Sequence, residues 1–299
     1  MGPCLGSIIN LITMTIGFIG QGFIGKNYAD DFERRGYSVV RYALEPQYAP
    51  NKDNIKNCDI VFIAVPTPTT PKGFDAGALY AVLPLVGSGK IAVIKSTTLP
   101  GTVKELQAAH PDIFVLHSPE FLQEKSAAYD AEHPQRNIVG VPVKNAEYDK
   151  RAREVLSVLP QAPYELVADS TETELIKYAG NFFLYVKVLY GNLMYDVAQS
   201  LGVDYDVVRA AVSADPRIGP SHLRVIDNSG HEGAVAGRGA GGHCFIKDTA
   251  ALRMLYEKVA PQDATGIALF RALETKNSEL LRTSGKDLDL LEAVYGKGV

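Results

Sequence analysis

The sequence contains no block of lysine or arginine residues. Its 299 residues carry a formal net charge of −4 at pH 7. Nucleic acids and anionic membranes attract proteins through clustered positive charge, so we expect neither as a partner. Hydrophobic residues make up 46% of the chain and charged residues 21%. This balance is typical of a folded protein with a core, not of a disordered one.

Cysteine and histidine are both scarce. The three cysteines, Cys4, Cys58 and Cys244, are odd in number and lack the spacing of metal ligands. This usage predicts a reducing, cytoplasmic location. The six histidines form no HExxH pair or similar arrangement, so neither a structural nor a catalytic zinc ion is expected.

Charged side chains are absent from residues 1–25, which could be mistaken for a signal peptide. The stretch lacks the basic segment that opens such peptides, and it contains many glycines. We expect residues 1–13 to be a disordered extension or an expression remnant, with Met14 near the natural start. No internal repeat or low-complexity segment is evident.

A glycine pattern follows the first apolar run. Met14–Ile19 predicts a strand, Gly20–Gly25 reads GQGFIG, and a helical pattern then continues to Gly36. A strand, GxGxxG and a helix in this order form the setting that a dinucleotide fingerprint requires. The first glycine makes the tight turn, the second admits the pyrophosphate, and the third lets helix pack on strand. The helix N-terminus faces the phosphates.

The second strand lacks one expected feature. Ser38–Tyr42 predicts this strand, and an acidic residue that binds the ribose hydroxyls is expected at its end. The nearest acid is Glu45. The choice between NAD and NADP therefore stays open, and Arg41 is either a partner for a 2′-phosphate or a solvated strand residue.

Four more apolar runs predict strands, namely Asp59–Val65, Ile91–Lys95, Ile113–Leu116 and Asn137–Gly140. Strands that alternate with helices predict an α/β fold with a doubly wound parallel sheet. Polar loops after the third, fourth and fifth strands meet at one edge of such a sheet, where ligands bind. These loops contain Pro66 and Thr67, then Thr97, then Glu120 and Glu124. Taken singly, Thr97, Glu120 and Glu124 are equally well explained as capping or surface residues.

The pattern becomes helical after about residue 165. Thr171–Gly202 has no proline, and its apolar residues surround most of its girth, so we expect burial on several sides and a homodimer joined through this helix. Within it, Lys177 and Asn181 are four residues apart and share a face. Taken alone, such a pair is more often a packed asparagine beside a lysine that extends its amine to solvent. Two further helices are expected, at Val203–Val212 and residues 265–282.

A glycine-rich stretch, residues 239–242, leads into Cys244. A helix is expected to begin near this cysteine, which places the thiol among unpaired N–H groups at the positive end of the helix dipole. That position favours a nucleophilic thiolate. Asp248 lies four residues further on the same face, with Lys247 beside it. The alternative is a small buried cysteine that fills the core.

Seven motifs in this order resemble the UDP-glucose/GDP-mannose dehydrogenase family. They cover residues 14 to about 285 and comprise the GxGxxG unit, Val65–Pro68, Lys95–Thr97, Ser118–Glu124, Lys177–Asn181, Asp215–Gly219 and Gly241–Asp248. The resemblance implies a Rossmann-type NAD-binding domain at residues 14–165. It also implies an all-helical dimerisation and catalytic domain at residues 166–285, followed by a tail at 286–299.

Members of this family oxidise the primary alcohol of a sugar nucleotide, such as UDP-glucose, to a carboxylate while two NAD are reduced. By resemblance, Cys244 attacks the aldehyde left by the first hydride transfer. The resulting thiohemiacetal becomes a thioester, which water hydrolyses. Lys177 and Asn181 are then the donors that stabilise the oxyanion, a role that suits a cation and an amide on one helix face.

The resemblance assigns the other site residues as well. Asp248 and Thr97 hold the hydrolytic water, Glu120 is the acid/base, and Arg217 reaches the neighbouring subunit's substrate. The implied substrate-binding positions are Glu120, Phe121, Leu122, Lys177, Asn181, Arg217 and Gly241. The implied cofactor-binding positions are Gly20, Gly22, Phe23, Ile24, Gly25, Pro66, Thr67, Thr97, Glu124 and Lys247.

The family pattern includes a third, Rossmann-like domain that closes over the substrate's nucleotide, and this sequence ends at the helix that leads into it. We therefore expect ordinary affinity for NAD and weak binding of a UDP-sugar. Two other interpretations are a two-domain β-hydroxyacid-type dehydrogenase and a degenerate chain that binds a dinucleotide or a partner. Cys244 argues against the first, because oxidation of an alcohol to a ketone needs no thiol. The intact set Cys244, Lys177, Asn181 and Asp248 argues against the second.

Overall fold

The computed structural model describes residues 14–231 and 233–298, which form two compact units. Unit 1 comprises the described residues up to Thr67 together with Ala76–Lys177. Unit 2 comprises Pro68–Asp75 together with the described residues from Tyr178 onward. The chain passes from unit 1 to unit 2 within the long helix α6 (Ser170–Leu201). Cys4 and the expected extension at residues 1–13 lie outside the described residues.

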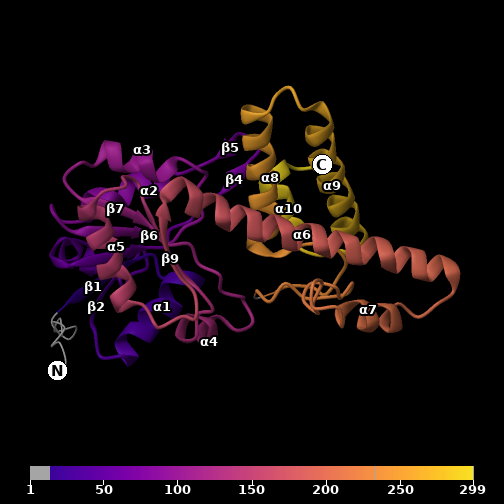
Figure 1. The fold of residues 1–299 in the computed structure, drawn as a ribbon, viewed down its shortest axis with the longest axis horizontal. Coiled ribbons are helices and arrows are strands. Elements are labelled where there is room, and N and C mark those ends of the chain that lie inside the picture. The colour runs from indigo at the N-terminus through magenta and orange to yellow at the C-terminus, as the bar shows by residue number, and fades with distance from the viewer. Residues whose placement is uncertain (1–13, 232, 299) are drawn as a thin grey trace, which may run out of the picture. The chain divides into compact units, whose positions relative to one another are not determined.

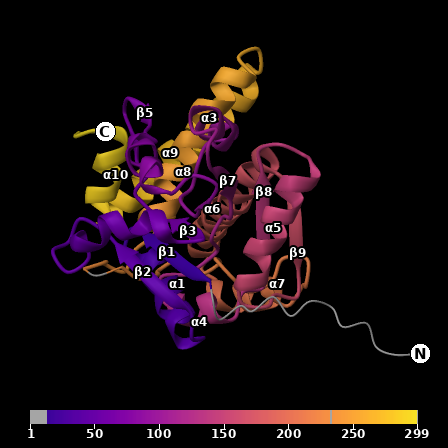
Figure 2. The ribbon, with the colours of Figure 1, turned by 90° about the vertical axis from the view of Figure 1, so that its left-hand side faces the viewer.

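Unit 1 is built on a seven-stranded sheet with the strand order β2-β1-β3-β6-β7-β8-β9 (Figures 1 and 2). Its neighbouring strands are parallel except for β7 and β8, which are antiparallel. The strands are β1 (Thr15–Ile19), β2 (Ser38–Tyr42), β3 (Ile60–Ile63), β6 (Ile91–Ile94), β7 (Phe114–His117), β8 (Asn137–Val141) and β9 (Glu165–Asp169). The chain order reverses between β1 and β3. Ligands of doubly wound sheets bind outside the carboxyl ends of the strands at such a switch point.

The sheet of unit 1 is covered on both faces. Phe18 and Phe62 belong to the core on one face, whereas their neighbours Ile19 and Ile63 belong to the core on the other. Successive strand residues point to opposite faces, so strands buried on both sides need an almost continuous apolar sequence. This requirement explains why every residue of β3 and β6 is both apolar and buried.

Helices supply the cover. They are α1 (Phe23–Arg34), α2 (Gly77–Val82), α3 (Thr102–Ala109), α4 (Ala127–Glu132) and α5 (Ala146–Val158), with the 3₁₀ segments η2 (Ala49–Asn57) and η3 (Leu83–Leu85). Figure 2 shows α5 running beside β8. The predicted α/β fold class is confirmed, and the six predicted strands are present with bounds within two residues. Strand β9 was not predicted.

Unit 2 contains helices and a short hairpin of β4 (Thr69–Thr70) and β5 (Gly73–Phe74), which the sequence did not reveal. Its helices are the greater part of α6, α7 (Tyr205–Ser213), α8 (Gly242–Val259), α9 (Ala264–Ser284) and α10 (Leu288–Tyr295) (Figure 1). The expected helices at 203–212 and 265–282 correspond to α7 and α9. Among residues 14–231 and 233–298, no helix has both the length and the apolar character to cross a membrane.

Helix α10 corrects one prediction. Residues 286–299 were expected to be a tail, but Leu291 and Val294 of α10 are buried in a core with Ile246 and Ala250 of α8 and Leu281 of α9. The pattern Leu288, Leu291, Val294 has helical spacing, so the signal was present in a short segment.

Candidate active site

The GQGFIG segment has the geometry that its glycines predict. Gly20 has φ +89°, and a Cβ there would meet the carbonyl oxygen of Ala64 after β3. A Cβ at Gly25 would meet the carbonyl oxygen of Gly20. At Gly22, by contrast, no atom of the described residues lies within 4 Å of the position that a Cβ would take. The absence of a side chain at Gly20 and Gly25 therefore lets neighbouring backbone of the protein pack closely, whereas Gly22 borders open space.

The start of α1 leaves its backbone donors to a ligand. Gly22 is the N-cap residue, no described side chain caps this end, and the first turn contains no acidic residue. The N–H groups and the positive dipole end therefore favour an anion. Together with the open space beside Gly22, these features fit the pyrophosphate of a dinucleotide. Phe23 and Ile24 form the first turn.

Arg41 near the end of β2 is occupied by two carboxylates of α1. Its guanidinium lies 2.7 Å from Asp30 and 2.8 Å from Glu33. It is therefore neither a solvated strand residue nor a free partner for a 2′-phosphate. The use of Arg41 as a phosphate ligand is thus disfavoured by two acids that the sequence places eleven and eight residues upstream of it.

The loops after β3 and β6 are joined by hydrogen bonds. Thr67 Oγ1 donates to the carbonyl of Thr97 at 2.7 Å, and Ser96 Oγ donates to the carbonyl of Val65 at 2.7 Å. Pro66 lies between Val65 and Thr67, the two residues of the loop after β3 that form these hydrogen bonds. Thr67 and Thr97 are both buried. These two sequence-predicted positions therefore meet at the carboxyl edge of the sheet.

Lys177 and Glu120 form a buried ion pair in unit 1. The Lys177 ammonium donates to Glu120 Oε1 at 2.9 Å and to the Glu120 carbonyl at 2.8 Å, and only 5% and 3% of these residues is exposed. Leu122 N donates to Glu120 Oε2 at 2.8 Å. The ring of Phe121 lies with its centroid 5.6 Å from the ammonium. The structure therefore excludes the interpretation of Lys177 as a lysine that extends its amine to solvent.

Lys95 is a further buried cation, for which the sequence alone indicated no role. Its ammonium donates to Ser118 Oγ at 3.2 Å and lies 4.3 Å from the ring centroid of Tyr28. Burial lowers the pKa of Lys95 to about 7; the charge of Glu120 opposes this shift and that of Lys177 adds to it. The signal in the sequence for a special role of Lys95 was its position at the end of an otherwise apolar strand.

Glu174 was also missed. This carboxylate of α6 accepts hydrogen bonds from Gly101 N at 2.7 Å, Val103 N at 2.9 Å and Thr98 Oγ1 at 3.0 Å. Burial raises its pKa to about 7, although the three donors pull it down. The carboxylate thereby fixes the loop that follows Thr97. Its position one helical turn before Lys177 was the only local signal.

In unit 2, α8 begins at Gly242, so Cys244 lies in its first turn, as the sequence predicted. The thiol is half-buried. Asp248, one turn further along, is 2% exposed and accepts from Asn181 Nδ2 at 2.7 Å and from Lys247 Nζ at 2.5 Å. The structure therefore brings Asn181, Lys247 and Asp248 together.

Three other predicted positions have less elaborate surroundings. The side chain of Arg217 is 86% exposed and is bound by Asp215, with 2.6 Å between Nη2 and Oδ2. Glu124 is half-buried in the loop between β7 and α4. Gly241 is the N-cap of α8 and lies against Asp287.

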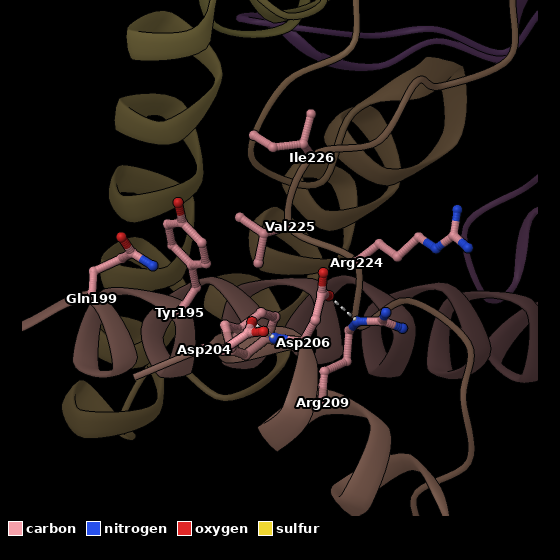
Figure 3. A pocket seen from close by; sticks show the side chains of 9 residues that line it. Tyr195, Gln199, Asp204, Asp206, Arg209, Arg224, Val225 and Ile226 are labelled. Carbon is pink, nitrogen blue, oxygen red and sulfur yellow. Dashed lines mark hydrogen bonds and ion pairs between the residues drawn. The ribbon is translucent and has the colours of Figure 1, made fainter. Parts of the chain in front are cut away.

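A pocket of unit 2 lies among α6, α7 and residues 224–226 (Figure 3). None of the predicted site residues lines it. Its walls carry the negative charges of Asp204 and Asp206 and the positive charges of Arg209 and Arg224. Arg209 Nε donates to Asp206 Oδ1 at 2.9 Å.

The two described cysteines should differ in reactivity. Burial raises the pKa of Cys58 to about 11, with Asp59 adding to the shift and Lys90 opposing it. Cys244 is half-buried at a helix start, where a thiolate is favoured. We expect a thiol alkylator at pH 7 to label Cys244 at least about 100-fold faster than Cys58. Peptide mapping separates the two from Cys4, and equal rates in the folded protein would refute the expectation.

Two segments match domains of one protein family. Residues 43–159 match the NAD binding domain of the UDP-glucose/GDP-mannose dehydrogenase family, and residues 171–279 match its central domain. The GQGFIG segment precedes the first match, so the evidence for it is its geometry. The family match and the geometry agree on a domain that binds NAD.

Individual proteins give the same result. The chain is 32% identical to the UDP-glucose 6-dehydrogenase of Rhizobium meliloti over 253 residues, which is 79% of this chain and 53% of that protein. A UDP-glucose dehydrogenase structure from the archaeon Pyrobaculum islandicum matches with a TM-score of 0.74 and 27% identity, over 90% of this chain and 69% of that one. The chain spans about half the length of the curated relatives it matches.

A 3-hydroxyisobutyrate dehydrogenase structure from Mycobacterium tuberculosis also matches, with a TM-score of 0.63 and 16% identity, over 96% of this chain and 99% of that one. At this identity the likeness extends to the fold alone. The two domain matches cover both units and agree with the order of the seven motifs. The chain belongs to the UDP-glucose/GDP-mannose dehydrogenase family.

Proposed function

We propose that the chain catalyses the NAD-dependent oxidation of the primary alcohol of a UDP-sugar, of the UDP-glucose type, to the carboxylate. The observation that carries this proposal is the position of Cys244 in the first turn of α8, one turn before the buried carboxylate of Asp248. A thiol nucleophile is needed to take an aldehyde on to an acid through a covalent intermediate. Oxidation of an alcohol to a ketone has no use for one.

The cofactor site of the proposal lies at the switch point of the sheet. When bound, NAD accepts a hydride in each of the two oxidations. Backbone N–H groups at the start of α1 hold the pyrophosphate, and Gly22 allows its close approach. The residues proposed to hold the cofactor are Gly20, Gly22, Phe23, Ile24, Gly25, Pro66, Thr67, Thr97, Glu124 and Lys247.

A methyl group at position 22 tests this site. Gly22 has φ −72°, and a Cβ there meets no atom of the described residues within 4 Å, so Gly22→Ala should fold with unchanged stability. The methyl group would occupy the space of the pyrophosphate. We expect the Kd for NAD to rise roughly 10-fold to 100-fold, as for the loss of one hydrogen bond to a charged group.

Calorimetry with NAD and a thermal melt of the same sample measure both effects. Gly20→Ala is the contrasting variant, since its Cβ would meet the Ala64 carbonyl at a positive φ and should cost stability too. Unchanged NAD affinity in Gly22→Ala would contradict the proposed cradle.

The proposed reaction proceeds through Cys244. The alcohol carbon loses a hydride and its hydroxyl a proton, which gives the aldehyde. The Cys244 thiolate adds to the aldehyde carbon and the oxygen takes up a proton, which gives a thiohemiacetal. Loss of a second hydride from this carbon and of the hydroxyl proton converts the thiohemiacetal to a thioester. Water adds to the thioester carbon, the C–S bond breaks, and the carboxylate and the free thiol are released.

Two donors on α6 stabilise the oxyanion in this proposal. Lys177 supplies a full charge and Asn181 an amide N–H one helical turn later, and both suit an oxygen on which negative charge develops. Each already binds a carboxylate of its own unit, Glu120 for Lys177 and Asp248 for Asn181. These contacts hold the donor side chains in fixed rotamers before substrate arrives.

The remaining roles concern protons and substrate. Glu120 is the acid/base, and Asp248 with Thr97 holds the hydrolytic water. The buried carboxylate of Asp248 has two donors to fix its orientation, which supports this role. The residues proposed to bind the sugar nucleotide are Glu120, Phe121, Leu122, Lys177, Asn181, Arg217 and Gly241.

We also propose a homodimer through α6. From Phe183 onward, its exposed large apolar side chains follow a spacing of three, four and seven residues, namely Phe183, Tyr190, Leu193, Val197 and Leu201, and each is at least 41% exposed. That spacing is the seam of paired helices. Arg217, exposed on the loop after α7, would serve the neighbouring subunit's substrate. We also propose a reducing, cytoplasmic setting, as the odd number of cysteines predicts.

A charge on the seam should separate the subunits. We expect Val197→Glu to sediment as a monomer at micromolar concentration while the original chain sediments as a dimer, because the carboxylate would be desolvated in the interface. The control is Gln199→Glu, which adds the same charge to an exposed position of α6 off the seam. A monomeric original chain, or a dimeric Val197→Glu variant, would contradict the proposed interface.

The proposed activity is tested by NAD reduction with a panel of UDP-sugars, GDP-sugars and small β-hydroxyacids. We expect NADH and a uronate product with a UDP-sugar. Reduction with hydroxyacids alone would identify the other dehydrogenase class, and no reduction with any compound would refute the proposal.

A further inference from the structure

The segment that leads into Cys244 is filled by the protein's own side chains. Three alternating glycines precede α8, and the position of a Cβ on each is taken by a side chain from residues 277–287. The pairs are Gly237 with Ser284, Gly239 with Asn277, and Gly241 with Asp287. The glycines of this segment are therefore required by packing against the end of α9 and the residues that follow it.

The same side chains hold the backbone of the segment by hydrogen bonds. Arg238 N donates to Ser284 Oγ at 3.0 Å, and Lys286 Nζ donates to the Gly239 carbonyl at 3.1 Å. The Asn277 amide accepts from Ala240 N at 2.7 Å and donates to the Ala240 carbonyl at 2.9 Å. Gly242 N donates to Asp287 Oδ2 at 2.7 Å. All these residues belong to unit 2. The run from 238 to 242 is thus anchored at four of its five residues.

Asp287 acts on the start of α8 itself. Gly242 is the first residue of this helix, and its N-cap, Gly241, has no side chain that could cap the turn. Helix starts are normally stabilised by an oxygen that accepts one of the first N–H groups. Asp287 supplies this oxygen from 45 residues away, to a residue that lies two positions before Cys244.

The carboxylate of Asp287 is itself firmly held. It accepts from Ser229 Oγ and from His231 Nε2, the latter at 3.0 Å, and the residue is 5% exposed. Burial alone would raise the pKa of Asp287, but hydrogen bonds from Ser229, Gly242 and His231 and the charge of Lys286 outweigh it and lower this pKa. Asp287 has φ +51°, a conformation that aspartate and asparagine tolerate better than other non-glycine residues.

We propose that Asp287 is a positioning residue for the nucleophile, which through the N–H of Gly242 and the anchors Ser229 and His231 fixes the turn that presents the Cys244 thiol. The inference rests on the proposed function in taking Cys244 as the nucleophile. It adds a residue that lies beyond the part of the chain that matches the family's central domain, residues 171–279.

Two variants separate the carboxylate's geometry from its charge. Asp287→Gly removes the acceptor and accommodates a positive φ without strain. Asp287→Asn removes the charge but keeps an oxygen for the N–H of Gly242 and tolerates the same backbone conformation. The matched control is Asp263→Ala. Asp263 caps α9 by accepting from Gly266 N at 2.9 Å and also accepts from Tyr256 Oη at 2.5 Å, so the bonds it makes here lie outside residues 238–244.

Hydrogen exchange and kinetics are measured on the full chain. We expect Asp287→Gly to exchange the amides of residues 241–245 about tenfold faster and to lose roughly 100-fold in turnover of the sugar nucleotide, with the KM for NAD unchanged. Asp287→Asn should retain most of the protection and of the turnover. Asp263→Ala should lose thermal stability but keep both properties.

Unchanged exchange at residues 241–245 in Asp287→Gly would overturn the inference. So would a loss of turnover in Asp287→Gly no larger than in Asp263→Ala. If the original chain oxidises no sugar nucleotide, the proposed function fails, while the exchange experiment still decides whether Asp287 fixes the turn.

Discussion

We expect the Cys244→Ala variant to form no carboxylate from a UDP-sugar while it still interconverts the alcohol and the aldehyde. Removal of a hydride from the alcohol requires no thiol. In the proposed route the second hydride leaves from the thiohemiacetal, because addition of the thiol gives the aldehyde carbon the oxygen whose negative charge drives the hydride out. We expect carboxylate formation to fall by at least about 10³-fold.

The products are separated by chromatography after incubation with the aldehyde and either oxidised or reduced cofactor. Cys58→Ala is the control, because Cys58 is a fully buried thiol whose raised pKa makes it inert. It should form carboxylate at the original rate. Undiminished carboxylate formation by Cys244→Ala would rule out covalent catalysis at this residue.

The second large effect concerns the buried pair of Lys177 and Glu120. Lys177→Met should lower turnover by about 10²–10³-fold, since it removes the charged donor that we propose for the developing oxyanion. It should also destabilise the fold by about 3–5 kcal/mol, because the carboxylate of Glu120, 3% exposed, loses its partner. Turnover and denaturant unfolding are measured on the same preparation.

A double variant separates the two losses. Lys177→Met combined with Glu120→Gln leaves no unpaired charge, so it should regain most of the stability and none of the turnover. The control is Arg253→Met, which breaks an ion pair outside the proposed site, between the half-buried Arg253 and the buried carboxylate of Glu274, with 2.7 Å between Nε and Oε2. It should lose stability and keep its turnover. Recovery of turnover in the double variant would contradict both proposed roles, that of Lys177 as an oxyanion donor and that of Glu120 as the acid/base.

The elements that could be predicted from the sequence carry strong local signals. β3 is apolar at every position because both faces of the sheet are covered, and GQGFIG follows β1 directly. The start of α8 near Cys244 was predicted from a glycine run followed by a helical pattern. β9 was missed because its five residues, Glu165–Asp169, are exposed or half-buried and lack an apolar alternation.

Contacts between distant residues could not be predicted from such signals. Lys177 meets Glu120 across 57 residues of sequence, and Asp287 meets Gly242 across 45. Gly239 and Gly241 belong to the glycine-rich stretch that the sequence shows, but the sequence does not reveal which groups pack against them. In the structure these groups are side chains of the chain itself, and the proposed contact of Gly241 with substrate stays a prediction.

The proposed reaction is a four-electron oxidation that passes through Cys244. Its most direct test is the ratio of NADH formed to carboxylate formed when the chain consumes a limiting amount of UDP-glucose. Two NADH per carboxylate, with no free aldehyde accumulating, is the result that the covalent route predicts. One NADH per sugar nucleotide consumed, with an aldehyde or ketone as the final product, would contradict it.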